Sequence, residues 1–439
     1  MKNFRILPLF LLLFTFPFLS SAQLDKKEKK IVASVDKHEE EALDLLKKAV
    51  NINSGTMNFS GVQEVGELFK DELNKLGFET RLTSGEAYGR AGHLVATHKG
   101  KPGLKLLLIG HLDTVFELDS PFQSATMVND TVMKAPGVAD MKGGDVIIIL
   151  AMQALKEAGV LKNMSVEIVM TGDEEKSGSP LELSKKELID AAKWADVALG
   201  FENGDGNPET IVVARRGSAG WKLEVTGNAA HSSQVFSEKV GVGAIYETSR
   251  ILNEFYRELS KEENLTFNPG FILGGTSVDL KEDETGGTAY GKTNVVAQKA
   301  LVKGDIRAVS LEQLEKARQK MTQIVSENYP QAQAKLTFDA GGYPPLGLTD
   351  GNNRLLNYYD EISRDLGYGK VHPVNPRNAG AADISFTAGH VDMAVDGLGL
   401  SGADDHTVNE TGNINKLGIQ AKRAALLMYR LSKMNEFKN

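Results

Sequence analysis

Three short runs of almost uniformly apolar residues most constrain the fold of this chain. They are LKLLLI at 104–109, SVEIVM at 165–170 and DVALGF at 196–201, and a helix-like stretch, DVIIILAMQAL at 145–155, separates the first two. Strands that are apolar on both faces must be covered on both faces, which is typical of a mostly parallel sheet between layers of helices. The sequence therefore predicts an α/β fold.

Further helices are predicted at both ends of this region. Apolar residues recur on one face of 36–50, and a second helix is expected to begin at a Ser60 cap and to end at Gly77. A final helix is predicted over 416–434. These helices would supply the layers that cover the sheet.

The pattern changes after residue 211. Segments such as WKLEVTG at 221–227 and AKLTFDA at 334–340 alternate apolar and polar residues, and two long helical segments lie among them. A strand-helix-strand-strand-helix-strand order indicates a ferredoxin-like α+β unit. We therefore predict a main domain formed by 23–212 and 343–439, interrupted by an inserted domain at 213–342.

The first 22 residues have the pattern of a cleaved export signal. Two basic residues precede an apolar run at 6–19, and small residues follow up to Ala22. An uncleaved membrane anchor is the alternative, but the run is short and contains two prolines. With no cysteine there can be no disulfide or cysteine-linked lipid. We expect a periplasmic or secreted protein with no membrane association in its mature form.

Polar residues follow the ends of the predicted strands. His111 and Asp113 follow the first strand, TGDEE at 171–175 ends the second, Glu202 follows the third, and Asp140 precedes a helix. By itself, an acidic triplet such as DEE is more often a solvated loop. Ligands of open α/β sheets, however, bind where the carboxyl ends of the strands meet. One imidazole and several carboxylates at that edge suit zinc or a similar divalent metal.

The eight histidines divide into candidates and structural residues. His406, in SGADDHTVNE, is the second metal candidate, and Asp113 is placed to orient the imidazole of His111. Five others are assigned satisfied or solvated structural roles: His38, His93, His98, His372 and His390. The net charge of −8 and the absence of a basic stripe argue against a nucleic-acid partner.

Taken together, these motifs resemble those of the M20 metallopeptidases. GHLDTV, GVADMKGG, GDEEKSGS, a glutamate after the next strand, and GxxxHxxxE (Gly402, His406, Glu410) occur in order. The resemblance implies an α/β zinc-peptidase catalytic domain with an inserted ferredoxin-like lid that forms a homodimer. It also implies two zinc ions per subunit, for which cobalt can substitute in vitro.

The resemblance implies a ligand for every metal position. Asp140 would bridge the two ions, His111 and Glu202 would complete one site, and Glu175 and His406 would complete the other. All five residues lie in the motifs quoted above.

It also implies the catalytic roles around these ligands. Glu174 would be the general base toward a water activated by the metals, and Asp113 would hold His111. The third acid of the triplet, Asp173, is expected to be a loop or capping residue.

Three residues of the inserted domain match the family as well. The resemblance implies that His231 and Asn294 reach the neighbouring subunit's site, and that Arg307 meets a substrate carboxylate. A local surface hydrogen bond is the alternative for each. Ala382 stands before Asp383 where the family often has Ser or Thr, which weakens the case for a glutamate-type specificity.

The expected function is cleavage of an amide bond next to a terminal carboxylate, in a small peptide or an N-acyl amino acid. Glu at position 202 resembles the carboxypeptidase, desuccinylase and acylase branches. An aminopeptidase or dipeptidase of the same superfamily is one alternative. A non-catalytic, metal-stabilised binding protein is another, against which Glu174 and Asp113 argue, because a scaffold needs ligands but no base.

Overall fold

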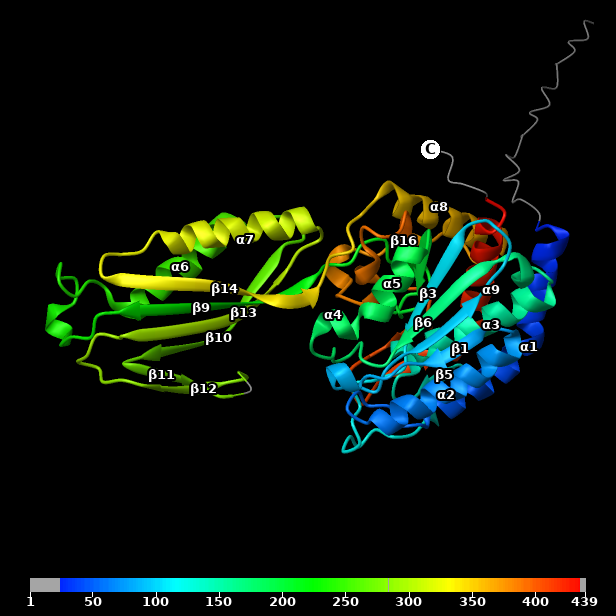
Figure 1. The fold of residues 1–439 in the computed structure, drawn as a ribbon, viewed down its shortest axis with the longest axis horizontal. Helices are drawn as coiled ribbons and strands as arrows, with labels where there is room; N and C mark the ends of the chain where they lie inside the picture. The colour runs from blue at the N-terminus through cyan, green and yellow to red at the C-terminus, as the bar shows by residue number, and fades with distance from the viewer. Residues whose placement is uncertain (1–23, 283, 435–439) are drawn as a thin grey trace, which may run out of the picture.

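The computed structural model describes residues 24–282 and 284–434, so the predicted export signal lies outside the described residues. These residues form a larger α/β part and a smaller α+β part that extends away from it (Figure 1). No helix in the described ranges is both long enough and apolar enough to span a bilayer. The predicted fold class is confirmed.

The three apolar runs form adjacent strands at the centre of the main sheet. The sheet has the order β1 (Glu79–Leu82), β2 (Leu94–His98), β6 (Ser165–Thr171), β3 (Lys105–His111), β7 (Val197–Gly200) and β16 (Met393–Val395). Strand β3 runs parallel to β6 and β7, and β16 runs parallel to β7, whereas β1 and β2 are antiparallel additions. The carboxyl ends of β3, β6 and β7 therefore meet at one edge.

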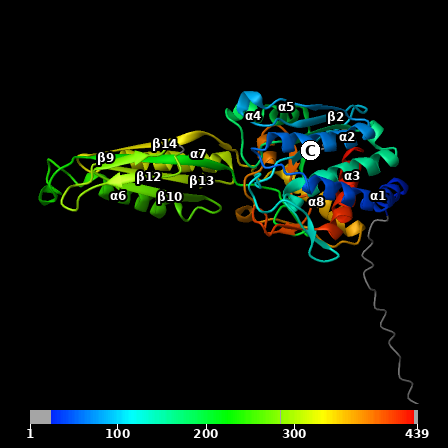
Figure 2. The same cartoon turned by 90° about the horizontal axis from the view of Figure 1, so that it is seen from below.

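Helices cover both faces of this sheet. One face packs against α1 (Lys26–Val50), α2 (Phe59–Leu76), α3 (Gly143–Glu157), α8 (Asp350–Asp365) and α9 (Leu417–Leu431), and the other packs against α5 (Lys186–Trp194), which follows the short α4 (Leu181–Ser184). Figure 2 shows α4 and α5 on one side and α1, α3 and α8 on the other. Leu106 and Leu108 enter the first core and Leu107 and Ile109 the second, which explains why β3 is apolar throughout.

The ends of three predicted helices differ in the structure. Helix α1 begins at Lys26, capped by Asp25, well before the predicted start. Helix α2 is capped by Asn58 and not by Ser60, because the Asn58 side chain accepts a hydrogen bond from the backbone N–H of Gly61. Helix α9 is shorter than predicted and ends at Leu431.

The smaller part is an antiparallel sheet covered on one face by two helices. Its order is β10 (Thr266–Gly275), β13 (Lys299–Arg307), β9 (Ser218–Gly227) and β14 (Ala332–Tyr343), and α6 (Gly243–Leu259) and α7 (Leu311–Ser326) share its core. This is the predicted ferredoxin-like arrangement. An additional hairpin, β11 (Ser277–Leu280) and β12 (Gly287–Tyr290), was not predicted.

Small sheets complete the main part. One has the order β17 (Gly402–Ala403), β18 (Thr411–Asn413), β5 (Val132–Lys134) and β4 (Thr126–Met127), and the other pairs β8 (Thr210–Ile211) with β15 (His372–Pro373). The β17–β18 connection carries His406. Because β18 pairs with β5, which shortly precedes Asp140, this sheet brings His406 close to Asp140.

Candidate metal centre

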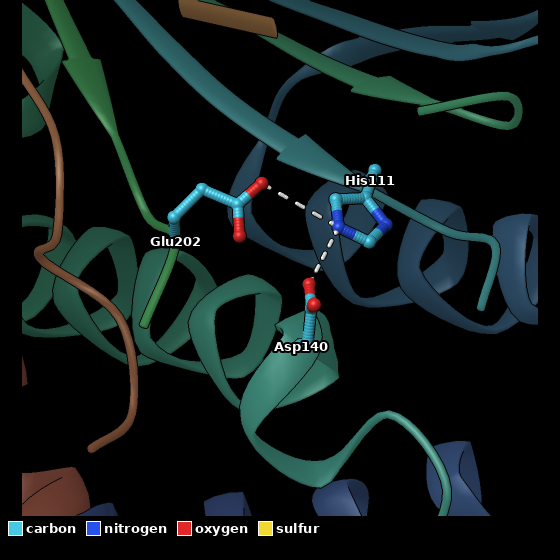
Figure 3. A group of neighbouring side chains, drawn as sticks. All are labelled: His111, Asp140 and Glu202. Atoms are coloured by element: carbon cyan, nitrogen blue, oxygen red, sulfur yellow. Dashed lines mark hydrogen bonds and ion pairs between the residues drawn. The ribbon is translucent and has the colours of Figure 1, made fainter. Parts of the chain in front are cut away.

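The five predicted ligands form two groups that share one residue. His111, Asp140 and Glu202 make the first group, and Asp140, Glu175 and His406 make the second, with the ligand atoms of each group within 4.8 Å of one another. Figure 3 shows the first group, in which the Asp140 and Glu202 carboxylates both point at the imidazole of His111. The structure therefore places Asp140 between two sites.

The distances in both groups fit metal coordination. Nε2 of His111 lies 3.1 Å from Oδ1 of Asp140 and 3.5 Å from Oε1 of Glu202. Nε2 of His406 lies 3.0 Å from Oδ2 of Asp140 and 3.1 Å from Oε2 of Glu175. Tetrahedral ligands about 2.0 Å from a zinc ion are ~3.3 Å apart. Each oxygen of Asp140 thus faces a different group, as a bridging carboxylate requires.

The site contains more buried carboxylates than imidazoles, a charge distribution that favours cation binding. Burial raises the pKa of Glu175 to about 7, with a further contribution from the negative charge of Asp140. Burial also raises the pKa of Glu202 well above its usual value, and Asp140 adds to this rise. Hydrogen bonds to Asp140 and Glu175 raise the pKa of His406 to about 11. Burial and an excess of carboxylates over imidazoles together explain these shifts, and two divalent ions would neutralise the excess negative charge.

The end of β3 fixes the orientation of His111. Its Nδ1–H donates to the backbone carbonyl of Asp113 at 3.0 Å, which leaves Nε2 as an acceptor directed at the ligand group. The Asp113 carboxylate is slightly farther, with Oδ1 3.5 Å from Nδ1. Asp113 therefore holds His111 mainly through its backbone, where the sequence pointed to its side chain.

The Asp113 side chain instead holds the acidic turn after β6. Its Oδ1 accepts the backbone N–H of Glu174 at 3.1 Å, and its Oδ2 accepts that of Glu175 at 3.2 Å. The hydroxyl of Thr56 donates to Oδ2 at 2.6 Å. A single buried carboxylate thus fixes the backbone of the predicted base and of the neighbouring ligand.

Glu410, the last residue of the GxxxHxxxE motif, fixes the loop that carries Asp140. Its carboxylate accepts the backbone N–H groups of Gly137 at 3.0 Å, Ala139 at 2.9 Å and Asp140 at 3.1 Å. The sequence analysis assigned Glu410 no role beyond its place in the motif. The same motif therefore supplies the ligand His406 and the support for Asp140.

Asp173 lies in the turn after β6, and its Oδ2 accepts the backbone N–H of Gly178 at 2.8 Å, as expected of a loop or capping residue. Its side chain is fully buried, and its Oδ1 lies 3.0 Å from Nζ of Lys185, which is also fully buried. The interior position arises because the turn after β6 enters the space between the main sheet and α5, where Lys185 neutralises the carboxylate.

Glu174 has the environment expected of a proton acceptor. Among the described residues, its carboxylate receives no hydrogen bond, although its backbone is anchored. Burial raises its pKa well above the usual value; His111 and Lys185 oppose that rise, and Asp383 and Glu175 add to it. A raised pKa favours transfer of a proton to this group near neutral pH.

The structure separates two of the predicted lid residues from the metal centre of their own chain. His231 and Asn294 lie beyond the end of β9 that points away from the main part, and the Ser232 N–H donates to the Asn294 carbonyl at 2.9 Å. His231 is exposed, and its Nδ1 lies 2.9 Å from the Ser233 hydroxyl. The two residues are brought together with each other but not with the ligands.

Arg307 lies at the opposite, near end of the lid, in a cluster of arginines that the sequence did not reveal. Arg216 donates to the carbonyl of Arg377 at 3.1 Å, and burial together with the nearby charges of Arg307 and Arg377 lowers its pKa. The Nε of Arg216 is buried and has no hydrogen-bond partner among the residues that the structure describes. In the sequence, the only signal that could have indicated this cluster is the adjacent pair Arg215 and Arg216 in VARRGS.

Arg215 connects this cluster to the metal centre. Its Nε donates to Oδ2 of Asp396 at 2.8 Å, and Oδ1 of Asp396 accepts the backbone N–H of Glu202 at 3.2 Å. Its NH1 donates to the carbonyl of Gly380 at 3.0 Å. Arg215 therefore lies beside the His111 group of ligands, and Arg216 is its neighbour in the chain.

The five other histidines have the predicted structural or solvated roles. His93 is buried, and its Nε2 lies 2.8 Å from the carbonyl of Ser184 while its Nδ1 accepts the Gly172 N–H at 3.1 Å. His38 forms hydrogen bonds with Glu41 and Glu157, His98 with the carbonyl of Met164, and His372 and His390 are exposed.

Comparison with known proteins agrees with this architecture. The model of Peptidase family M20/M25/M40 matches residues 107–430. Carboxypeptidase G2 of Pseudomonas sp. (strain RS-16) is 26% identical over 397 residues and is covered to 89%, as is this chain. Succinyl-diaminopimelate desuccinylase of Coxiella burnetii is 23% identical over 381 residues, which cover 84% of this chain and 94% of the relative.

Solved structures share the fold at lower identity. The aminopeptidase PepT of Bacillus cereus has a TM-score of 0.69 at 20% identity, over 90% of this chain and 98% of that one. The metallo-carboxypeptidase Sso-CP2 of Sulfolobus solfataricus has a TM-score of 0.64 at 17% identity, over 90% and 100%. Because the family model spans most of the chain and both groups of candidate ligands are assembled, the chain belongs to peptidase family M20/M25/M40, as a metallopeptidase.

Proposed function

We propose that this protein is a dizinc hydrolase that cleaves an amide bond next to a terminal carboxylate. The donor set supports zinc: each group offers one imidazole nitrogen and carboxylate oxygens at tetrahedral spacing, with no cysteine in the chain. When bound, two such ions activate water as a nucleophile and polarise the scissile carbonyl. The side chains of the protein would supply proton transfer and substrate binding.

Glu174 is the proposed proton carrier. Its carboxylate takes a proton from the attacking water and then delivers it to the leaving nitrogen, so that an amine and a carboxylic acid are released. Asp113 and Tyr343 hold the backbone of Glu174 from its N–H and its carbonyl, respectively. The base therefore acts from a fixed position.

The proposal of a carboxylate-bearing substrate rests on the arginine cluster. Arg216, Arg307 and Arg377 bring their positive charges close together, and Arg216 follows Arg215, which is linked through Asp396 to the backbone of Glu202. The unpartnered Nε of Arg216 leaves a donor for an anion. A substrate carboxylate held there would place the adjacent amide bond toward the ligands. Carboxypeptidase G2 and succinyl-diaminopimelate desuccinylase, both relatives by sequence, are consistent with such a substrate.

The test is a panel of short peptides and N-acyl amino acids, with product identification, on zinc-loaded protein. Each compound is supplied with a free and with an amidated C-terminus, and each peptide with a free and with an acetylated N-terminus. We expect amidation to abolish cleavage and acetylation to be tolerated. The reverse pattern would identify an aminopeptidase instead, the second candidate. The Arg377→Met variant should raise KM for carboxylate substrates more than it lowers kcat.

We also propose that the protein acts as a homodimer joined through the lid. Among the described residues of the lid, eight large apolar side chains are exposed, and a partner surface would cover part of this set. They are Phe236, Ile245, Tyr246, Tyr256, Ile272, Tyr290, Leu311 and Tyr329. Sedimentation of the wild-type protein beside an Ile245→Asp, Ile272→Asp variant tests this proposal. A monomeric wild-type protein would contradict it.

The proposed location is the periplasm or the extracellular space, after cleavage behind Ala22. The support is the sequence pattern of residues 1–22 alone. N-terminal sequencing of the protein recovered from its native host would show a chain that begins at Gln23 if the proposal is correct.

A further inference from the structure

A buried cation lies directly behind the turn that carries Glu174. Nζ of Lys185 lies 3.0 Å from Oδ1 of Asp173 and 3.0 Å from Oδ1 of Asp383. Lys185 and Asp173 are fully buried, and Asp383 is 3% exposed. Asp173 belongs to the turn at 171–178 that carries the proposed base Glu174, called the base turn below. Lys185 lies between α4 and α5, and Asp383 begins a short helical turn after the lid. One ammonium group therefore joins three segments.

The remaining oxygens of the two carboxylates tie down both ends of the base turn. Oδ2 of Asp383 accepts the hydroxyl of Thr171, the last residue of β6, at 2.6 Å. Oδ2 of Asp173 accepts the backbone N–H of Gly178, beyond the turn, at 2.8 Å. The position of residues 171–178 thus depends on two carboxylates that stay in place only while a cation balances them.

The same network reaches toward the substrate side of the site. Asp383 follows Ala382 and Gly380, and the carbonyl of Gly380 accepts a hydrogen bond from Arg215. The Lys185 ammonium also lies over the ring of Tyr343, 5.6 Å from its centroid. Lys185 is thus located between the turn that carries the base and the segment next to the arginine cluster.

We propose that Lys185 is a positioning residue that fixes Glu174 relative to the bound substrate. It does so by holding Asp173 and Asp383 together, so that the base turn and the substrate-side segment keep one relative position. The proposal rests on the proposed function of Glu174 as the base. A displacement of about 1 Å in a reacting group lowers a rate by about 10²-fold. Lys185 therefore acts on catalysis without contact with the substrate.

The kinetic experiment compares Lys185→Met, Lys185→Arg and the matched control Lys186→Met in zinc-loaded protein. Lys186 is the next residue, is exposed and pairs with Asp190 on the surface. We expect Lys185→Met to bind two zinc ions per chain, to lower kcat by about 10²-fold and to change KM by less than about threefold. Lys185→Arg should recover at least tenfold in kcat, and Lys186→Met should behave as wild type.

A second readout does not depend on activity. Hydrogen–deuterium exchange of the peptide that spans 171–178 should be faster in Lys185→Met and unchanged in Lys186→Met. If the wild-type protein cleaves no compound of the panel, the proposed function fails, but the exchange experiment still decides whether Lys185 holds the base turn. Unchanged exchange in Lys185→Met would overturn the inference.

Two further outcomes are decisive. If Lys185→Met does not fold, the triple variant Asp173→Asn, Lys185→Met, Asp383→Asn takes its place, because it leaves no unbalanced charge in the interior. The same loss of kcat in that variant supports the proposal. A folded, zinc-loaded variant, single or triple, with wild-type kcat would show that the network serves stability alone and would overturn it.

Discussion

The hydroxyl of Tyr343 donates a hydrogen bond to the backbone carbonyl of Glu174 at 2.9 Å. Tyr343 is the last residue of β14 and pairs with Ser218, the first residue of β9, so both strands that join the lid to the main part meet at this point. The backbone of Glu174, the proposed general base, is therefore hydrogen-bonded to the point where the lid joins the main part.

Removal of this hydroxyl should impair catalysis without loss of metal. We expect Tyr343→Phe to bind two zinc ions, to lose about 1 kcal/mol of folding stability and to lower kcat about tenfold. The control is Tyr290→Phe, which removes a hydroxyl from an exposed lid residue. Steady-state kinetics and thermal unfolding of both variants check this prediction, and equal kcat values for the two would refute it.

Substitution of the neighbouring acids Glu174 and Glu175 should have different effects on zinc content and kcat. Glu174→Ala should keep both zinc ions and lose about 10³-fold in kcat, because it removes a proton carrier but no ligand. Glu175→Ala should bind less zinc, since its Oε2 belongs to the His406 group. Metal analysis and kcat together separate the two roles. Equal zinc loss in the two variants would show that the assignment of these neighbours is wrong.

Much of this site could be predicted because its ligands follow strand ends or lie in spaced motifs. His111, Glu175 and Glu202 come after three apolar strands, and a parallel sheet brings such ends to one edge. The sequence could not show how segments far apart in the chain support each other. The contacts of Lys185 with Asp383, and of Glu410 with the loop of Asp140, depend on tertiary packing.

The differences between the predicted and the observed fold have identifiable causes in short segments. Asn58 and Ser60 are both good helix caps, and only the three-dimensional course of the chain decides that Asn58 bonds the Gly61 N–H. The hairpin of β11 and β12 consists of short, largely polar strands without a clear apolar alternation. The two-residue strand β17 is too short for any periodic pattern.

Chelation should remove activity and lower stability together. Without cations, the carboxylates of Asp140, Glu175 and Glu202 repel one another, and their burial is uncompensated. Saturating zinc at about 1,000 times its dissociation constant stabilises the fold by about 4 kcal/mol. We expect zinc or cobalt to restore both the melting temperature and activity, at two ions per chain. Full activity at a metal content near zero would contradict the proposed chemistry.

The pair of His38 and Glu157 predicts a pH-dependent contribution to stability away from the metal centre. Burial lowers the pKa of His38, but hydrogen bonds with Glu41 and Glu157 outweigh this effect and raise it overall. A raised histidine pKa stabilises the fold fully below the unfolded value of about 6.5 and loses that effect as pH rises through the folded value.

His38→Gln should therefore destabilise the protein by about 1 kcal/mol at pH 6 and by less at pH 9. The control is His372→Gln, at an exposed position, which should have little effect at either pH. Thermal unfolding of each variant is compared with wild type at the same pH and metal content. A larger effect of His38→Gln at pH 9 than at pH 6 would contradict the prediction.

The position of His231 leaves two roles for this residue. Strand β9 begins where the lid joins the main part and runs for ten residues, or roughly 33 Å, toward the far end of the lid, and His231 follows that end of the strand. His231 therefore cannot reach the metals of its own chain in this conformation. It either completes the site of a partner subunit, where it would stabilise the developing oxyanion, or it is a surface residue bonded to Ser233.

Mixed dimers distinguish these roles. His231→Ala and Glu174→Ala should each be nearly inactive alone. In a heterodimer, the site with an intact Glu174 would receive an intact His231 from the other chain. Random exchange at equal mixing makes about half of all dimers heterodimers with one working site each, so activity should return to about a quarter of the wild-type value. Nearly full activity of His231→Ala alone, or no recovery after demonstrated subunit exchange, would exclude the role in the partner's site.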